Sequence, residues 1–287
     1  MKVGFIGLGT MGLPMAQCLL RGGLEIVGWD SNPRARQQFD ATAESIEQLA
    51  RDCDVFITML PEANHVTEVI DQLLGHCSES GCLFIDCSTI DVESTRKVST
   101  RLSDKGHGFV DAPVSGGSEA AANGALSLMI GGDGTDIERA RPLLVTMSAK
   151  LIEFGAAGSG QAAKACHNMI CGITALGVCE SFALADALKL DLDKFFQLCS
   201  AAAAQSWILE NRCPVPGPAP AAPASNDYAP GFAARLMAKD LGLAQQAAQT
   251  AGQATEFGAA AARRFREFAD SGAGDLDFSA IYRVIRK

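Results

Sequence analysis

The apolar positions of the first 155 residues fall into short runs that are separated by amphipathic stretches. Four runs contain almost only apolar residues, which predicts strands buried on both faces of a sheet; they span residues 2–8, 24–30, 54–60 and 82–88. Helical spacing in the stretches between them, as at 10–23 and 92–106, predicts that strands and helices alternate. Such alternation is typical of a parallel sheet with right-handed crossover connections.

The same alternation continues beyond residue 106. Two further strand candidates lie at 108–114 and 125–132, and a helix near 134–147 with a strand at 149–154 would complete the domain. We therefore expect a mostly parallel, doubly wound sheet over this part of the chain.

The pattern changes near residue 160. From residue 161 to 287 nearly every segment is helical and rich in Ala and Leu, except 213–231, whose prolines exclude a helix or a central strand. Because this stretch lies between helical runs of one unit, we expect an ordered loop and not a flexible linker. A helix over 159–188 would be about 45 Å long and shared between both parts. The pattern predicts an α/β domain over 1–160 and an all-α domain over 161–287.

Composition and charge narrow the class of protein. The chain is 48% hydrophobic and 20% charged, with a formal net charge of -9 and a pI near 5.0. No basic run of five or more residues occurs, which argues against a nucleic-acid partner. Ten cysteines without a CxxC pair, and four scattered histidines, favour buried free thiols over zinc ligands or disulfides. We expect this of the thiols in or beside apolar segments, which are Cys53, Cys82, Cys87, Cys166, Cys171 and Cys179.

The chain shows no sign of a leader or a membrane span. "MKVGFIGLG" opens it without a charged and apolar leader pattern. The longest apolar candidate, 165–188, is interrupted by polar residues and falls short of the roughly 20 apolar residues that a span requires; these residues are His167, Asn168, Glu180 and Asp186. With thiols that suit a reducing compartment, this predicts a soluble, cytoplasmic protein without a membrane partner.

A glycine-rich turn follows the first predicted strand directly. In "GFIGLGTMG", Gly7 permits the tight turn, Gly9 lets a pyrophosphate approach the backbone, and Gly12 allows close packing of helix against strand. The phosphates would lie at the N-terminus of the helix that begins near Thr10. Asp30, at the end of the second strand, is placed to bind the ribose hydroxyls. This pattern predicts a Rossmann-type dinucleotide site that includes Leu8 and Met11.

The acidic residue bears on the choice of cofactor. A carboxylate at Asp30 repels a 2′-phosphate, which favours NAD over NADP. Arg34 and Arg36 lie close enough in sequence to weaken that preference. We expect NAD.

A second glycine turn ends a later strand. "DAPVSGG", residues 111–117, places Ser115 before Gly116 and Gly117. A hydroxyl and two backbone N–H groups of this kind can bind an anion. An ordinary strand-to-helix turn would show the same residues, so this motif alone leaves both interpretations open.

Four segments together resemble the β-hydroxyacid dehydrogenases. "GFIGLGTMGLPMA", "DAPVSGGSEAAANGALSLMIGG", "GQAAKACHNM" and "LMAKDLGLA" occur in the order and at the separations of that family's signatures. Within the family, "CPVPG", "GFAARLMAKDLGLA" and "DFSAIYRVI" are most similar to the 3-hydroxyisobutyrate dehydrogenases. The resemblance covers nearly the whole chain. It implies an N-terminal Rossmann domain joined by a long interdomain helix to an all-helical domain for substrate binding and oligomerisation.

The resemblance also implies roles for individual residues. The family's catalytic lysine corresponds to Lys164, and the asparagine that holds the substrate corresponds to Asn168. The Ser-Gly-Gly that receives the substrate carboxylate corresponds to Ser115, Gly116 and Gly117. Lys239, followed by Asp240, corresponds to a lysine that reaches the active site and cofactor. The cofactor-side loops correspond to Met59, Leu60, Pro61, Ser88 and Thr89.

Lys164 lies in an unusually apolar helical stretch. An apolar, partly closed cleft disfavours the charged ammonium, which lowers a lysine pKa toward the range useful for general acid/base catalysis. Asn168 follows after four residues and therefore lies one turn away on the same helix face. Gly172 and Ala175 continue that face with little bulk, which leaves space for close packing or for a ligand. We interpret His167, where the family usually has a second asparagine, as structural.

These observations predict NAD-dependent oxidation of 3-hydroxyisobutyrate to methylmalonate semialdehyde, a step of valine catabolism. The chain departs from that branch at Ala204 and Gln205, which replace a Gly-Arg pair before Trp207. A reductase of tartronate semialdehyde or another short semialdehyde is therefore an alternative. A non-catalytic dinucleotide-binding protein is a more remote one, because such relatives lack the lysine that this chain retains. The apolar helical half further predicts a homodimer or homotetramer.

Overall fold

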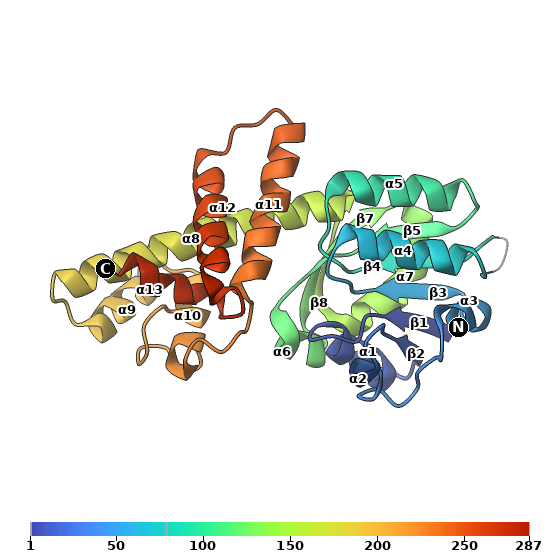
Figure 1. Ribbon diagram of the computed structural model, residues 1–287, viewed down its shortest axis with the longest axis horizontal. Helices are drawn as coiled ribbons and strands as arrows, with labels where there is room; N and C mark the ends of the chain where they lie inside the picture. The colour runs from blue at the N-terminus through green and yellow to red at the C-terminus, as the bar shows by residue number, and fades with distance from the viewer. Residues whose placement is uncertain (1, 78–79, 287) are drawn as a thin grey trace. The chain divides into compact units, whose positions relative to one another are not determined.

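The computed structural model describes residues 2–77 and 80–286. Its chain forms two compact units, Met1–Lys164 and Ala165–Lys287, which are described separately below. Figure 1 follows the chain from its N-terminus to its C-terminus.

The first unit is built on a mostly parallel sheet, as the alternating pattern predicts. The strands are β1 (Lys2–Ile6), β2 (Glu25–Trp29), β3 (Val55–Thr58), β4 (Leu83–Asp86), β5 (Gly108–Asp111), β6 (Val114–Ser115), β7 (Leu126–Gly132) and β8 (Ser148–Gly155). Their order is β2-β1-β3-β4-β5-β7-β6, and β8 pairs with β7. The pairs from β2 to β5 and the β7–β8 pair are parallel, whereas β7 runs antiparallel to β5 and β6.

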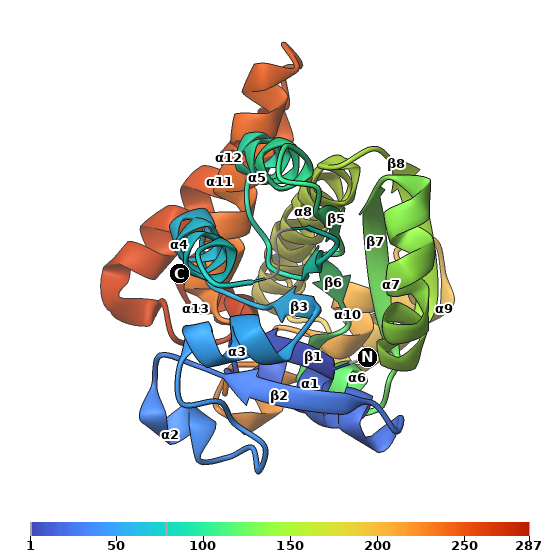
Figure 2. The ribbon, with the colours of Figure 1, turned by 90° about the vertical axis from the view of Figure 1, so that its right-hand side faces the viewer.

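Helices cover both faces of this sheet (Figure 2). They are α1 (Gly12–Arg21), α2 (Pro33–Arg36), α3 (Ile46–Asp52), α4 (Ala63–Leu74), α5 (Val92–Ser103), α6 (Gly117–Ala122) and α7 (Gly134–Met147). One core joins α1, α6 and α7 to side chains such as Phe5 and Ile57. A second core joins α3, α4 and α5 to alternate residues of the same strands, such as Ile6 and Phe56. Because successive strand side chains point to opposite faces, almost continuous apolar runs supply both cores.

Two strand predictions differ from the structure. β2 lies at the edge of the sheet, so its residues alternate in exposure and are not buried on both faces. The run predicted as one strand over 108–114 is divided into β5 and β6. Pro113 lies between them and has no N–H to donate to a neighbouring strand.

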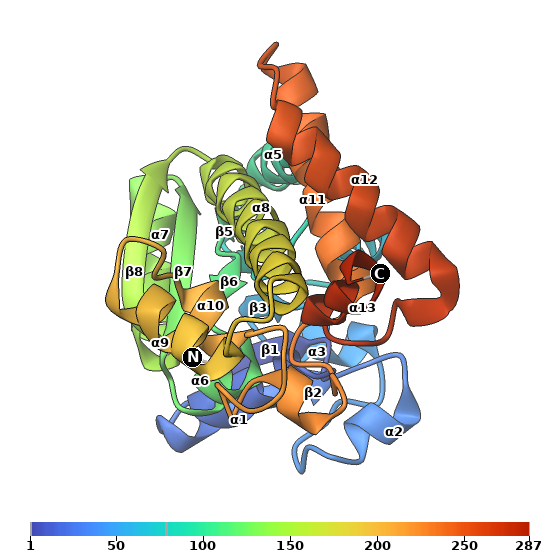
Figure 3. The same ribbon diagram turned by 90° about the vertical axis from the view of Figure 1, so that its left-hand side faces the viewer.

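The second unit is helical, as predicted (Figure 3). It contains most of α8 (Ser159–Ala187), then α9 (Leu192–Ala201), α10 (Trp207–Asn211), α11 (Ala234–Thr250), α12 (Glu256–Phe268) and α13 (Tyr282–Ile285), with short 3-10 turns at Pro223–Asn226 and Phe278–Ile281 and a π-helical turn at Ala269–Ala273. Its core is formed by Phe182, Met237, Leu241, Phe265 and Phe278 with their neighbours. α8 begins in the first unit, because Lys164 is that unit's last residue.

The proline-rich stretch 213–231 is an ordered loop, as expected. Cys213, Val215 and Tyr228 are buried in the helical core. The Tyr228 hydroxyl donates to the carbonyl oxygen of Pro214 at 2.6 Å, which closes the loop on itself.

Thiol burial was predicted correctly for four of the six cysteines named above. Cys53, Cys82, Cys87 and Cys179 are buried. Cys166 is exposed and Cys171 is only half-buried. Both lie on α8, whose apolar residues surround the helix axis, so a neighbourhood that is apolar in sequence does not place a given side chain inside.

α8 meets the length and composition criteria for a membrane-crossing helix, contrary to the expectation from its polar residues. Its most apolar 18-residue window has a mean hydropathy of 1.5, and 33% of that window is buried. No other helix among residues 2–77 and 80–286 meets these criteria. A core helix of a soluble protein meets them as well, so α8 by itself does not establish a membrane span.

Candidate active site

In the glycine turn between β1 and α1, Gly7 and Gly12 are tightly packed, whereas Gly9 faces open space. Gly7 has φ +98°, and a β-carbon there would lie 2.3 Å from the Met59 carbonyl oxygen. A β-carbon on Gly12 would lie 1.8 Å from the Gly7 carbonyl oxygen, so the helix packs directly on the turn. A β-carbon on Gly9 would meet no atom within 4 Å. The turn therefore offers bare backbone where a pyrophosphate would approach.

The start of α1 is available to an anion. Met11 stands at the N-cap, and its side chain makes no capping hydrogen bond, so the residue at the cap leaves the first N–H groups and the positive end of the helix dipole to another acceptor. Thr10 is exposed beside them, whereas Leu8 is buried and contributes its backbone. These residues fit the pyrophosphate of a dinucleotide.

Asp30 contacts the turn itself. Its Oδ2 accepts a hydrogen bond from the Leu8 N–H at 2.7 Å, and its Oδ1 accepts one from the Asn32 N–H at 2.8 Å. Each carboxylate oxygen retains a further lone pair for a ribose hydroxyl. Asp30 thus supports the glycine turn as well as offering an acceptor to the cofactor.

The two loops expected near the cofactor follow neighbouring parallel strands. Met59 and Leu60 follow β3, and the Leu60 N–H donates to the Ser88 hydroxyl at 2.9 Å. Ser88 follows β4, is fully buried, and donates its own N–H to Asp86 at 3.0 Å. Its side chain therefore positions the Leu60 loop. Pro61 and Thr89 extend these loops at the carboxyl ends of the strands, where ligands of open α/β sheets bind.

The structure brings Lys164 to the second glycine turn. The Lys164 ammonium nitrogen donates to the Val114 carbonyl oxygen at 2.7 Å, and that carbonyl belongs to the peptide that precedes Ser115. Gly116 and Gly117 have φ values of +136° and +76°, which L-residues with side chains rarely adopt. Lys164 is 7% exposed. A basic nitrogen and a turn able to bind an anion are therefore neighbours, as the resemblance implies.

Two buried residues, one at the end of β5 and one in the first turn of α8, were not identified from the sequence. Both carboxylate oxygens of Asp111 accept backbone N–H groups, from Gly158 at 2.8 Å and Gln161 at 2.9 Å. The Gln161 side chain donates to the Ser88 carbonyl oxygen at 2.7 Å. A carboxylate that directly ends an apolar strand was a visible signal for Asp111; nothing in the sequence marked Gln161.

Asn168 is held by partners in the second unit. Its Nδ2 donates to Asp240 at 2.6 Å, and Asp240 is 4% exposed. Because the amide nitrogen faces this carboxylate, Oδ1 faces His167 and accepts from its Nδ1 at 2.9 Å. The Lys239 ammonium lies 3.3 Å from the other carboxylate oxygen of Asp240. Asp240, noted from the sequence only as a neighbour of Lys239, therefore orients Asn168.

Gly172 serves helix packing. A β-carbon there would lie 2.8 Å from the Leu241 side chain, so α11 contacts α8 where the glycine leaves room. Ala175 is 2% exposed in the same core. The Leu241 side chain therefore occupies the space that Gly172 leaves.

One cluster of potential metal ligands lies elsewhere in the first unit. Ligand atoms of Cys77, Cys82 and His107 lie within 4.8 Å of one another. The Cys82 N–H donates to His107 Nδ1, however, so the neutral ring carries its proton on Nε2, the nitrogen that lies 4.0 Å from Cys77. Burial lowers the pKa of His107 and raises that of Cys77 to about 11. The Cys77 thiol therefore keeps its proton, and the His107 ring is neutral.

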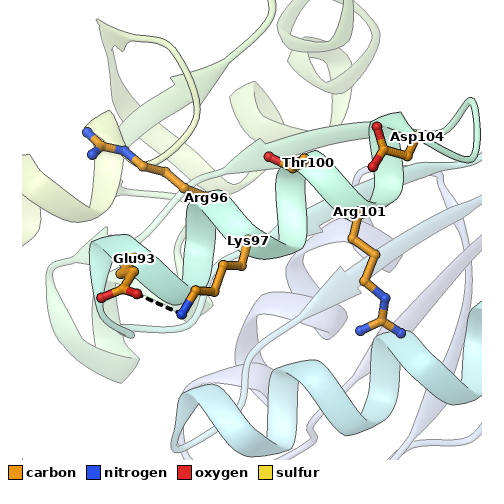
Figure 4. A pocket seen from close by; sticks show the side chains of 6 residues that line it. All are labelled: Glu93, Arg96, Lys97, Thr100, Arg101 and Asp104. Atoms are coloured by element: carbon orange, nitrogen blue, oxygen red, sulfur yellow. Dashed lines mark ion pairs between the residues drawn. The ribbon is translucent and has the colours of Figure 1, made fainter.

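Two surface hollows lie away from these residues. One hollow of about 380 Å³ runs along α5 and is lined by both acidic and basic side chains of that single helix, including the Glu93–Lys97 pair (Figure 4). Another, of about 710 Å³, lies in the second unit among Asp186, Tyr228 and Arg283. Neither of these two hollows is lined by Lys164, Ser115 or Asn168.

Comparisons with known proteins identify the family of each part of the chain. Residues 2–155 match the family model of the NAD-binding domain of 6-phosphogluconate dehydrogenase. Residues 158–285 match the model described as NAD-binding of NADP-dependent 3-hydroxyisobutyrate dehydrogenase.

Similar proteins match over the full length. A probable 3-hydroxyisobutyrate dehydrogenase of Mycobacterium tuberculosis is 40% identical over 99% of this chain and 97% of its own. An NAD-dependent L-serine dehydrogenase of Pseudomonas aeruginosa is 39% identical, with the same shares covered. A solved structure of the M. tuberculosis 3-hydroxyisobutyrate dehydrogenase with L-serine superposes with a TM-score of 0.93 at 40% identity, covering 100% of this chain and 99% of that one. The chain therefore belongs to the β-hydroxyacid dehydrogenase family and is an NAD-binding hydroxyacid dehydrogenase.

Proposed function

We propose that the protein oxidises 3-hydroxyisobutyrate to methylmalonate semialdehyde with NAD. The observation that carries the proposal is the contact of the Lys164 ammonium with the peptide before Ser115, at 2.7 Å. This contact supports a proton-exchanging role for Lys164 beside a turn that would bind the substrate carboxylate. Full-length similarity to 3-hydroxyisobutyrate dehydrogenases supports this choice of substrate.

Each residue of the site has a role in this proposal. Ser115, Gly116 and Gly117 bind the substrate carboxylate. As a neutral amine, Lys164 accepts the hydroxyl proton during oxidation, and the ammonium so formed returns a proton to the aldehyde oxygen in reverse. Asn168, held by Asp240, donates its second amide N–H to the substrate, and Lys239 binds substrate and cofactor. NAD, when bound, supplies the hydride acceptor; its proposed contacts are Gly7, Leu8, Gly9, Thr10, Met11, Gly12, Asp30, Met59, Leu60, Pro61, Ser88, Thr89 and Lys239.

A second candidate substrate is L-serine. A relative named NAD-dependent L-serine dehydrogenase is 39% identical over nearly the whole chain. L-serine and 3-hydroxyisobutyrate share the 3-hydroxy acid skeleton and differ by an ammonium in place of a methyl group. A polar pocket wall would favour serine and an apolar one would favour the methyl group. Gln205 departs from the 3-hydroxyisobutyrate dehydrogenase pattern and is polar, so it would favour L-serine if it lines the pocket.

The experiment is a set of initial rates with NAD and with NADP. The substrates are both enantiomers of 3-hydroxyisobutyrate, L-serine, glycerate and 3-hydroxypropionate, each with wild type, Lys164→Ala and the exposed control Lys150→Ala. We expect the highest kcat/KM for one enantiomer of 3-hydroxyisobutyrate with NAD. Lys164→Ala should lower kcat by about 100-fold or more, the size of a general acid/base contribution, whereas Lys150→Ala should not. A higher rate with L-serine or glycerate would reject the substrate; an unchanged rate in Lys164→Ala would reject the mechanism.

We further propose a soluble, cytoplasmic homodimer or homotetramer. Residues 1–160 would bind NAD, and 161–287 would serve substrate binding and oligomerisation. Large apolar side chains exposed in the helical unit support an interface between copies; they include Ile170, Leu184, Leu188, Leu198, Trp207 and Phe257. Light scattering after size exclusion would show a mass of two or four chains, and a monomer would refute the interface.

A further inference from the structure

Asp111 binds the start of the helix that carries Lys164. It is the last residue of β5 and is completely buried. Its two oxygens accept the N–H groups of Gly158, just before α8, and of Gln161, in its first turn. A carboxylate there satisfies donors that a helix start leaves unpaired and faces the positive end of the dipole. The α8 N-terminus is thus capped by a residue of the sheet.

The packing around this carboxylate leaves no room for a shift. A β-carbon on Gly131 would lie 2.6 Å from Oδ1, and one on Gly160 would lie 2.8 Å from Oδ2. The Gly160 β-carbon would also lie 2.3 Å from the Met129 carbonyl oxygen. Strand β7 and the first turn of α8 therefore close directly on Asp111, which requires glycine at both positions.

The same segment holds both partners of the Lys164 contact. Asp111 lies three residues before Val114, whose carbonyl oxygen accepts from the Lys164 ammonium. Gln161, which Asp111 binds, lies three residues before Lys164 and therefore on a neighbouring part of the helix surface. The Asp111 carboxylate thus fixes the first turn of α8, which precedes Lys164, relative to the segment that carries the Val114 carbonyl oxygen.

We propose that Asp111 is the positioning residue for Lys164: it sets the place of the ammonium nitrogen beside the Ser115–Gly117 turn. The inference rests on the proposed acid/base role of Lys164. Without the carboxylate, the Gly158 and Gln161 N–H groups lose their acceptor, the first turn of α8 loosens, and the ammonium leaves its position at Val114.

The strength of these hydrogen bonds depends on the protonation state of Asp111. Burial raises its pKa to about 6, the two backbone N–H groups oppose that rise, and the negative charge of Asp86 on β4 adds to it. From α8 the facing groups are backbone N–H donors, and from β7 the nearest residue is Gly131. A protonated carboxyl has one oxygen that carries a hydrogen and accepts poorly, so the cap weakens below about pH 6.

The test compares Asp111→Asn with Asp133→Asn. Asp133 caps α7 in the same unit by accepting the Thr135 N–H at 2.9 Å, and it is exposed and distant in sequence from the lysine. Amide hydrogen exchange at Gly158 and Gln161 should become at least tenfold faster in Asp111→Asn and stay unchanged in the control. NMR of protein reductively methylated with ¹³C-formaldehyde should show a shifted Lys164 titration in the same variant only.

Kinetics give the second readout. Asp111→Asn should lower kcat by about tenfold or more while the KM for NAD stays within twofold, and it should remove a loss of activity near pH 6 that wild type shows. If no hydroxy acid is oxidised by wild type, the proposed function fails, but the exchange and titration data still decide the role of Asp111. If Asp111→Asn does not fold, wild type is measured from pH 7.5 to 5. The protection factor of the Gln161 amide, which corrects for the pH dependence of exchange itself, should fall over the same pH range in which the NMR shift of Lys164 changes. Unchanged exchange and titration would overturn the proposal.

Discussion

Substitution by alanine should have different effects at two glycines of the turn between β1 and α1: it should lower the stability at Gly12 and the affinity for the cofactor at Gly9. A methyl group on Gly12 would lie 1.8 Å from the Gly7 carbonyl oxygen and 2.9 Å from its carbonyl carbon. These are backbone atoms, so no side-chain rotation relieves the overlap, and α1 would have to move from β1 by about 1.6 Å or more to reach ordinary contact distance. A methyl group on Gly9 meets nothing within 4 Å, and its φ lies outside the left-handed region.

The magnitudes follow from these contacts. Overpacking a rigid site costs about 1–3 kcal/mol and more when backbone must move, so we expect Gly12→Ala to lose about 3 kcal/mol of unfolding free energy. For a chain of 287 residues, that loss lowers Tm by about 5 °C. Gly9→Ala should keep the stability of wild type to within about 1 kcal/mol. Its methyl group would instead occupy the place where the pyrophosphate approaches, and we expect at least a tenfold higher Kd for NADH.

Thermal unfolding followed by circular dichroism measures the first effect, and titration calorimetry with NADH at 20 °C measures the second. The two variants serve as controls for each other, because each should change mainly one quantity. A Gly12→Ala protein as stable as wild type would show that the helix does not pack on the turn as described. Unchanged NADH binding by Gly9→Ala would show that the pyrophosphate lies elsewhere.

Three further predictions concern buried or partly buried carboxylates. Asp240→Ala, Asn168→Ala and the double variant should show a coupling of about 1–2 kcal/mol in kcat/KM, because both residues act through one 2.6 Å hydrogen bond; additive effects would separate them. Asp111 should make the protein more stable, by up to about 3 kcal/mol, as pH falls from 7 to 4, since its pKa of about 6 in the folded state exceeds the ordinary 3.8. Urea unfolding of wild type and Asp111→Asn at pH 5 and 7 measures this difference, and stability of wild type that falls relative to the variant on acidification would contradict it. Asp30→Ala should raise the Kd for NAD about tenfold and reduce discrimination against NADP, since it removes the acceptor of the Leu8 N–H and the charge that repels a 2′-phosphate; unchanged cofactor ratios in initial rates would refute this role.

Much of the architecture was predictable because it depends on neighbours along the chain. Alternation of apolar runs with helical stretches reports which faces are buried, and the helical pattern after residue 160 needs no knowledge of distant contacts. The glycine turn could also be predicted from neighbouring residues, because the tight turn after β1 requires a positive φ at Gly7, which glycine adopts readily. The same is true of Lys164 and Asn168, which share a helix face because they are four residues apart.

Proximity along the chain could not predict which side chains face one another. Cys166 lies in an apolar stretch, yet it is exposed, because exposure depends on which side of α8 another element covers. The division of 108–114 into β5 and β6 likewise depends on the antiparallel partner β7.

The supports of the proposed active site belong to this second class. Asp111 lies 47 and 50 residues from the backbone groups that it binds, and Asn168 lies 72 residues from Asp240. A buried carboxylate must find donors wherever packing brings them, and that choice is made between segments far apart in sequence. The sequence by itself determined the strand–helix order, the glycine turns and which residues are proposed to carry the chemistry; only the tertiary structure decided which buried groups hold those residues in place.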